Sequence, residues 1–216
     1  MEPAQIGERR AVVKAPAKLP MLMMGFHTPT LSNHKQLTDQ DWEPYALEML
    51  AGVLSGNDSS RLNQKLVRES ALAIDVGAGY DSTARGQESL FELVGTPSEG
   101  KTVQELEAAL WQQIELIKTG GVTQQELDRV KAAVIAADVY QRDSMFYQGM
   151  QIGQLETMGY SWRLLDEYPK RLKTVTSEQI QEVAKKYLVK DNMTVTTLDP
   201  QPIDPNAKPV GKPHIH

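Results

Sequence analysis

The chain of 216 residues is 40% hydrophobic, which is enough for one domain with a substantial core. Its formal net charge of −5 argues against nucleic acid and anionic membranes as general partners, because both favour basic surfaces. No apolar run approaches the roughly 20 residues that span a bilayer. The absence of cysteine excludes disulfides, thiol nucleophiles and Cys-based zinc sites.

The beginning of the chain predicts two strands. Residues 1–9 are polar, and we expect them to be loose. Residues 10–15 and 19–27 are each typical of a short strand, and Pro16 with the few residues between the strands favours a hairpin. The polar residues 28–41 predict a surface loop.

Two helices are predicted next. Residues 42–54 carry apolar side chains at the i, i+3, i+4 spacing of one buried helix face, namely Tyr45, Ala46, Met49, Leu50 and Val53. A turn at residues 55–57 separates this helix from a second one over residues 59–69, in which Leu62 and Leu66 face inward.

A hairpin is predicted after the second helix. Residues 73–82 alternate as a strand does, with one face made of Ile74, Val76, Ala78 and Tyr80. Residues 85–87 are typical of a turn, and residues 89–96 return as the partner strand.

From residue 102 the period of the apolar residues changes from two to 3.6. Capping boxes at Thr102–Glu105, Thr123–Glu126 and Thr176–Gln179 each predict the start of a helix. The second of these helices runs to about Met158, with a bend or restart at Asp143-Ser144, and residues 162–172 form another amphipathic helix.

The order of these elements predicts the fold class. Residues 193–198 predict a final strand, which has to return to the sheet across the helices. The expected fold is α+β, with a single mixed β-sheet covered mainly on one face by helices. Residues 10–200 form the domain, and residues 201–216 form a Pro-rich extended tail.

The residue chemistry alone assigns no reaction. The four histidines are His27, His34, His214 and His216, and none belongs to a zinc-binding helix motif. The last two are better explained by a loose tail than by a metal site, which needs a fixed shell. No nucleophile-elbow serine or phosphate loop is present.

Two arginines are the best candidates for binding. Arg61 and Arg68 lie seven residues apart on one predicted helix, roughly on the same face. Together they could bind a carboxylate or a peptide carbonyl through charge-assisted hydrogen bonds. The alternative is a solvated or locally paired surface, since exposed arginine is common.

Several segments resemble one known family. Gly56-Asn-Asp-Ser-Ser-Arg-Leu62, followed by Leu66-Val-Arg-Glu69 and a strand, resembles the second homologous domain of the M16 family of zinc metallopeptidases. Residues 7–10, 121–131 and 175–198 resemble the opening, a helix start and the closing segment of that domain. The resemblance covers about residues 7–200, and it rests on the order and spacing of the motifs.

The resemblance implies an α/β roll of the LuxS-like metallohydrolase type, two of which form half a clamshell. Zinc sits on a His-x-x-Glu-His helix in one domain, and this chain lacks that motif. It is therefore similar to the non-zinc half, with no metal site and no catalytic residue of its own. The implied partner is a zinc-binding M16 domain, either upstream in the same polypeptide or on a separate subunit, and a homodimer is a further possibility.

The family also implies site residues. In active members, the non-zinc domain lends an Arg and a Tyr that bind the substrate backbone and stabilise the oxyanion. Arg68 matches the Arg, whereas Ile74 stands where the Tyr is expected. Tyr80 lies six residues further along the strand, about 20 Å away, so Tyr80 and Arg61 are weaker candidates than Arg68.

Two functions from different classes follow. The first is the non-zinc half of a peptidase, inactive alone, which forms one wall of the cavity for a peptide or unfolded protein substrate. The alternative is a catalytically degenerate scaffold or peptide-binding subunit of the same fold, and Ile74 in place of Tyr favours it. Bacterial relatives of this type are often exported, so the resemblance suggests a periplasmic location.

Overall fold

A single five-stranded sheet organises the chain in the computed structural model, which describes residues 5–31, 41–84, 88–142 and 144–203. The strands lie in the order β1-β5-β2-β4-β3. Their bounds are Arg9–Pro16 (β1), Met21–Pro29 (β2), Ala73–Tyr80 (β3), Glu88–Pro97 (β4) and Met193–Gln201 (β5). The sheet is mixed, because β1 pairs with β5 in parallel and every other pair is antiparallel.

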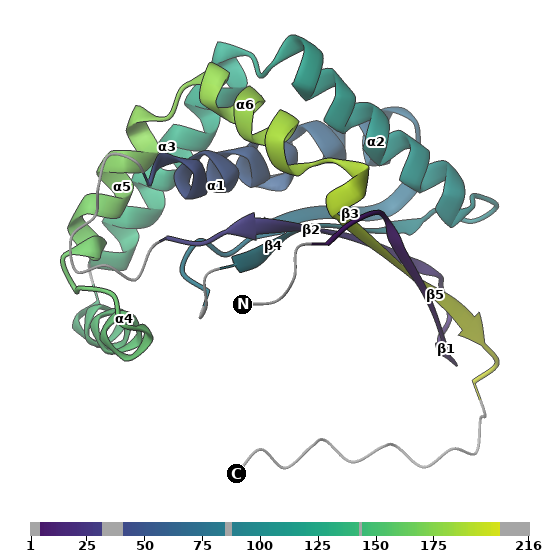
Figure 1. Cartoon of the computed structure of the whole chain (residues 1–216), viewed down its shortest axis with the longest axis horizontal. Coiled ribbons are helices and arrows are strands. Elements are labelled where there is room, and N and C mark those ends of the chain that lie inside the picture. Colours follow the sequence, from purple (N-terminus) through teal and green to yellow (C-terminus); the bar gives the residue numbers. More distant parts are fainter. Residues whose placement is uncertain (1–4, 32–40, 85–87, 143, 204–216) are drawn as a thin grey trace.

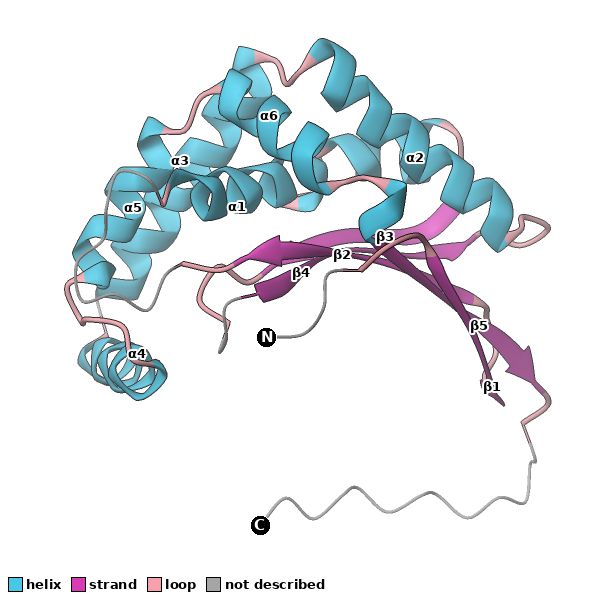
Figure 2. Ribbon diagram, in the orientation of Figure 1, coloured by secondary structure: helices cyan, strands magenta, loops and turns pink. Residues whose placement is uncertain are grey.

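Helices cover one face of this sheet (Figures 1 and 2). The helices that pack on the strands are α1 (Trp42–Ser55), α2 (Val103–Gly120) and α6 (Ser177–Tyr187). Two further helices, α3 (Gln124–Arg142) and α5 (Leu164–Thr174), pack against α1 and against each other. The remaining helix, α4 (Met145–Met158), lies at one end of the layer. The predicted α+β class, with one mixed sheet and a helical layer mainly on one face, is confirmed.

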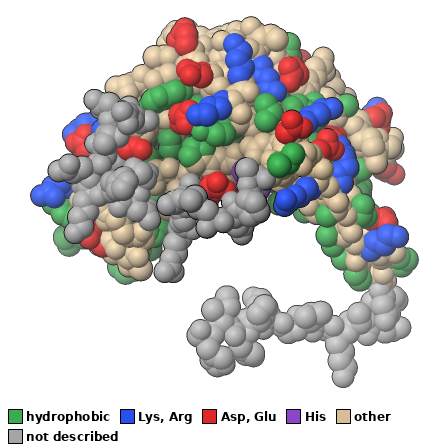
Figure 3. Space-filling view, viewed as in Figure 1, with side chains coloured by type: hydrophobic (Ala, Val, Ile, Leu, Met, Phe, Trp, Pro, Cys, Tyr) green, Lys and Arg blue, Asp and Glu red, His purple; other side chains and the backbone are tan. Residues whose placement is uncertain are grey.

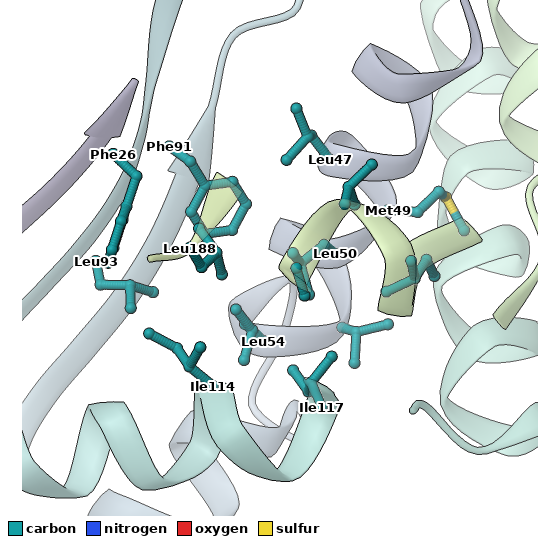
Figure 4. Close-up of a cluster of buried hydrophobic side chains, with 14 of the residues drawn as sticks. Phe26, Leu47, Met49, Leu50, Leu54, Phe91, Leu93, Ile114, Ile117 and Leu188 are labelled. Carbon is teal, nitrogen blue, oxygen red and sulfur yellow. The ribbon is translucent and has the colours of Figure 1, made fainter. Parts of the chain in front are cut away.

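The core lies between the sheet and the helices. The sheet contributes Phe26, Phe91 and Leu93, which are fully buried beneath apolar side chains of α1 and α2 (Figure 4). Ile114 and Ile117 come from α2. Burying a large apolar side chain of this kind contributes about 1.5–3 kcal/mol, so this layer is the main source of stability.

The predicted hairpin of the first two strands is wrong. β5 lies between β1 and β2 and bonds to both, with Arg10 opposite Val195 on one side and Met23 opposite Thr196 on the other. A short connection shows that the chain reverses, but it cannot show that a strand from the far end of the chain fills the space between.

The predicted surface loop at residues 28–41 is also wrong at its start. Thr28 and Pro29 belong to β2, and Thr30 and Leu31 are buried. Tyr160 donates a hydrogen bond to the Leu31 carbonyl at 2.9 Å, which holds this segment beneath the helical layer. Residues 32–40, like the predicted turn at residues 85–87, lie outside the described residues.

The helix starts are where the capping boxes predict. Thr102 and Thr176 each accept a hydrogen bond from the backbone three residues on, and the reciprocal bonds from their own N–H groups are present. Thr123 and Glu126 make the same pair of bonds at the start of α3. The predicted restart is confirmed at Ser144, which caps α4, while Asp143 lies outside the described residues.

Replacing Thr176 by alanine tests the contribution of a cap. The change removes the hydroxyl that accepts from the Gln179 N–H and exposes an orphan donor at the start of α6. We expect the free energy of unfolding to fall by about 1 kcal/mol in urea titrations. Thr176→Ser keeps the hydroxyl, and an equal loss in this control would show that the cap is not the cause.

The surface carries both signs of charge. Figure 3 shows basic and acidic side chains interspersed over the helical layer rather than gathered into a single basic patch. No helix among the described residues combines the length and the apolarity that crossing a membrane requires.

Candidate substrate-binding site

Arg68 lies at the end of a short helical segment that leads into β3. The segment, η1 (Asn63–Glu69), is a π-helix, so the predicted α-helix over residues 59–69 is α-helical only at its start. The Arg68 side chain is 59% exposed, and its guanidinium lies 3.6 Å from Asp58, which is itself 93% exposed. An ion pair this open contributes little, so the guanidinium is accessible to a ligand.

The backbone around Arg68 is irregular at three successive points. The first is η1 itself, since π-helical turns are rare and are frequent at functional sites. The second is Ala71, whose φ of +48° is a left-handed conformation that costs a non-glycine residue about 1 kcal/mol. The third is a register shift between Ala73 and Asp75 in β3. Irregularities of this kind gather where a protein positions functional side chains.

Ile74 is the extra residue of that register shift. Ala73 pairs with Pro97 and Asp75 with Thr96, so Ile74 has no partner on β4. Its side chain is 53% exposed, whereas Val76 is 4% exposed. The prediction that Ile74 shares a face with Val76, Ala78 and Tyr80 is therefore wrong, because the bulge breaks the alternation.

Arg61 is paired with a carboxylate of the helical layer. Its guanidinium makes a bidentate pair with Glu126 at the start of α3, with both N–O distances 2.8 Å. The two side chains are only 13% and 18% exposed. Burial by itself raises the pKa of Glu126, but hydrogen bonds from Arg61 and Thr123 outweigh it and lower that pKa to about 2. Arg61 thus links the segment before η1 to the start of α3, whereas the ion-pair partner of Arg68 is Asp58.

Tyr80 lies at the opposite end of β3 from Ile74. Its hydroxyl donates to the Pro29 carbonyl, and its ring stacks on Phe91 with the ring centroids 6.4 Å apart. Burial raises the pKa of Tyr80 far above its usual range. The six residues between it and Ile74 correspond to about 20 Å of strand, so Tyr80 is remote from Arg68.

The described residues contain no metal cluster. No group of three or more His, Cys, Asp or Glu among them is arranged to hold a metal ion. His27 is half-buried at the end of β2, 3.7 Å from Glu88. His34, His214 and His216 lie outside the described residues.

Sequence reasoning missed a polar cluster inside the helical layer. Glu48 of α1 faces Ser82 and Tyr168, whose hydroxyl oxygens are 2.9 Å apart. The three side chains line a cavity of about 510 Å³. One feature of the sequence points to this cluster: Glu48 is the only charged residue between Pro44 and Leu54, in a stretch of α1 that is otherwise apolar.

Solved structures share this fold. A protease from Helicobacter pylori superposes with a TM-score of 0.81 at 23% identity, over 92% of this chain and 46% of the protease. The inactive peptidase domain of a predicted zinc protease from Bordetella parapertussis gives 0.74 at 20% identity, over 92% of this chain and 99% of that domain. A peptidase M16 inactive domain from Pseudomonas fluorescens gives 0.72 at 18% identity, over 94% of this chain and 47% of that chain. At these identities the likeness establishes the fold alone.

The family follows from the sequence match. The chain spans about half of the Helicobacter pylori protease. No curated protein matches the chain. Residues 1–134 match the family described as the peptidase M16 inactive domain, in which the zinc belongs to the partner domain. With more than half of its residues in that match, the chain belongs to the M16 peptidase family as one of its inactive domains.

Proposed function

We infer that this chain is the non-catalytic half of an M16 zinc peptidase, in which it forms one wall of the peptide-binding cavity and contributes Arg68 to substrate binding. The family match carries the inference. The length supports it, because the chain covers 46% of a protease with the same fold. The open guanidinium of Arg68 among three backbone irregularities supports the choice of residue.

Arg68 would act on the substrate backbone. Its planar guanidinium can donate two parallel hydrogen bonds, and such bonds strengthen when the acceptor becomes charged. A zinc ion bound in the partner domain would supply a polarised water as the nucleophile for the peptide carbonyl. Arg68 would then stabilise the negative charge that develops on the carbonyl oxygen, and it would hold the scissile segment in place.

The edge of the sheet offers a second recognition element. Within the part of the chain that the structure describes, β3 is hydrogen-bonded to one strand, β4, and it contacts η1, the segment that carries Arg68. At Ala78 this edge is already occupied by Ser55, whose hydroxyl accepts a hydrogen bond from the Ala78 N–H and donates one to the Ala78 carbonyl. An extended peptide added as a strand toward the Ile74 end would be held by its main chain, which favours unfolded substrates of varied sequence.

One observation favours a degenerate scaffold or peptide-binding subunit instead. The position expected to carry a Tyr holds Ile74, which lies exposed in a bulge and has no hydrogen-bonding group. The chain would then keep the fold and the interface with its partner but lack half of the oxyanion support.

Reconstitution separates the two functions. The chain is mixed with the His-x-x-Glu-His domain encoded upstream or beside it, zinc is added, and cleavage of casein is followed. We expect cleavage only when both halves and zinc are present, and its loss with a chelator. Cleavage by the zinc half alone would show that this chain is not required for catalysis. A stable complex of the two halves that cleaves no tested peptide would support the scaffold.

A further inference from the structure

A cavity in the helical layer is separate from the Arg68 site. It lies between α1, α3, α4, α5 and the residues that follow β3, and its volume is about 510 Å³. Pockets that hold small organic ligands occupy roughly 300–1,000 Å³. The cavity is therefore large enough for an amino-acid side chain or a small amine.

The wall of the cavity is acidic and apolar. Glu48 and Asp81 line it, together with the apolar side chains Ile152, Leu155, Met158 and Leu165. No Lys, Arg or His is among the described residues that line it. A positively charged group inside the cavity would therefore meet carboxylates, and no cationic side chain of the described lining residues competes with it.

Glu48 is the inner carboxylate. Burial raises its pKa, while hydrogen bonds from Tyr168 and Ser82 lower it without cancelling the effect of burial. The hydroxyls are donors, and the neighbouring charge is a second carboxylate, Asp81. Hydroxyl donors orient a carboxylate but do not neutralise it, and an ionised carboxylate is costly to bury unless it is paired.

Asp81 is the outer carboxylate. It is exposed, and it accepts hydrogen bonds from the backbone N–H and the hydroxyl of Thr83 at 2.8 and 2.9 Å. These bonds fix its side chain just before Ser82, which is buried. The cavity wall therefore carries one exposed, oriented carboxylate in addition to the more buried Glu48.

We propose that this cavity binds an organic cation, an alkylammonium or guanidinium group whose charge meets Asp81 and Glu48 and whose hydrocarbon stem lies against Leu155, Met158 and Leu165. Lysine and arginine side chains have this shape, with an apolar stem and a charged tip. A metal ion is a poor occupant, since no three metal-ligating side chains of the described chain are arranged to hold one. The ligand is therefore either the basic side chain of a peptide or a free amine, and both share this chemistry.

Calorimetric titration of the purified chain tests the proposal without the peptidase partner, so its result is independent of the proposed function. The probes are an acetylated and amidated Ala-Lys-Ala peptide, the same peptide with norleucine in place of lysine, and spermidine. We expect the lysine peptide to bind at least tenfold more tightly than the norleucine peptide. If spermidine binds as tightly as the lysine peptide, the source is a free amine. If it binds more weakly, the source is a peptide side chain. Equal affinity for the lysine and norleucine peptides would overturn the proposal.

Glu48→Gln locates the site. The amide keeps the shape and can still accept from Tyr168 and Ser82, but it has no charge. We expect this variant to lose at least tenfold in affinity for the lysine peptide. Glu43→Gln is the matched control, because Glu43 lies on the same helix, pairs with Lys186 and does not line the cavity. Equal affinities for wild type and Glu48→Gln would contradict the assignment.

A pH series gives a readout that a structural role would not produce. The carboxylate form of Glu48 binds the cation, so the affinity should rise as pH increases through the raised pKa of Glu48, and Glu48→Gln should show a smaller rise. Of the residues whose side chains the structure describes, the other titratable groups that line the cavity or face Glu48 are Asp81 after β3, Tyr80 in β3, Tyr147 in α4, and Asp166 and Tyr168 in α5. If the affinity for the lysine peptide depended on pH in the same way in the wild type and in Glu48→Gln, Glu48 would not be the carboxylate that binds the cation.

The variant should remain folded. The folded state raises the pKa of Glu48, so it holds the proton more tightly than the unfolded state. The free energy of unfolding of the wild type therefore falls as pH rises from the unfolded pKa through the folded pKa. Glu48→Gln lacks this loss and should be at least as stable as the wild type at neutral pH.

Discussion

Arg68→Ala in the complete two-domain enzyme is expected to lower kcat/KM for an unfolded protein substrate about 100-fold, the usual effect of removing one oxyanion donor. The free energy of unfolding should change by less than about 0.5 kcal/mol, because the ion pair with Asp58 is exposed at both ends. Steady-state kinetics and urea unfolding measure the two quantities. A fall in kcat/KM without a fall in the free energy of unfolding would show that Arg68 acts on the substrate and does not stabilise the fold.

Matched variants on the same segment control this test. Lys65 also lies on η1 and pairs with Glu69 across an exposed surface, so Lys65→Ala should change kcat/KM less than twofold. Arg68→Lys keeps the charge but not the planar fork, and its kcat/KM should lie between those of the wild type and Arg68→Ala. If the complete enzyme cleaves the substrate and Arg68→Ala leaves its kcat/KM unchanged, Arg68 does not take part in substrate binding or catalysis.

The helical half of the fold could be predicted because its signals are local. A capping box needs only four residues, and those at Thr102, Thr123 and Thr176 place three helix starts correctly. The strands were also found, since alternation and apolar runs act within one segment. The fold class follows from the order of these elements along the chain.

The topology of the sheet could not be predicted in the same way. The place of β5 between β1 and β2 depends on contacts between residues nearly 200 positions apart, such as Arg9 and Thr194. The tight approach of α1 to α3 is equally non-local, because a Cβ on Gly52 would come within 2.6 Å of Val130. Pairing of this kind leaves no pattern within either segment.

The candidate site was found only in part, for a related reason. The motif around Arg68 makes it a candidate, and its role stays a prediction. The bulge at Ile74 could not be predicted, because alternation does not reveal which residue is extra. Glu48 was missed because its partners, Ser82 and Tyr168, come from distant elements. The expectation that Arg61 and Arg68 lie roughly on one helix face assumed a regular α-helix, whereas η1, which carries Arg68, is a π-helix.

Arg61→Ala should produce the largest loss of stability among these variants. The change leaves Glu126 without the bidentate partner that reaches it from the segment before η1. Removing one member of a buried pair costs about 3–5 kcal/mol, and the partial exposure of this pair places the expected loss at about 2 kcal/mol. Urea unfolding at neutral pH measures it. Glu126→Gln provides the reciprocal change, and the double variant should lose less than the sum of the two.

The pH dependence of Arg61→Ala identifies the electrostatic part of that loss. Glu126 has a pKa of about 2 in the folded chain, below its ordinary value of 4.5. Its contribution to stability is therefore present above the unfolded pKa and is lost as pH falls from about 5 to about 2. Arg61→Ala should flatten this part of the profile, so the difference in free energy of unfolding between wild type and variant should shrink toward acid pH. A difference that stays constant from pH 7 to pH 2 would show that Arg61 stabilises the chain by packing rather than by its charge.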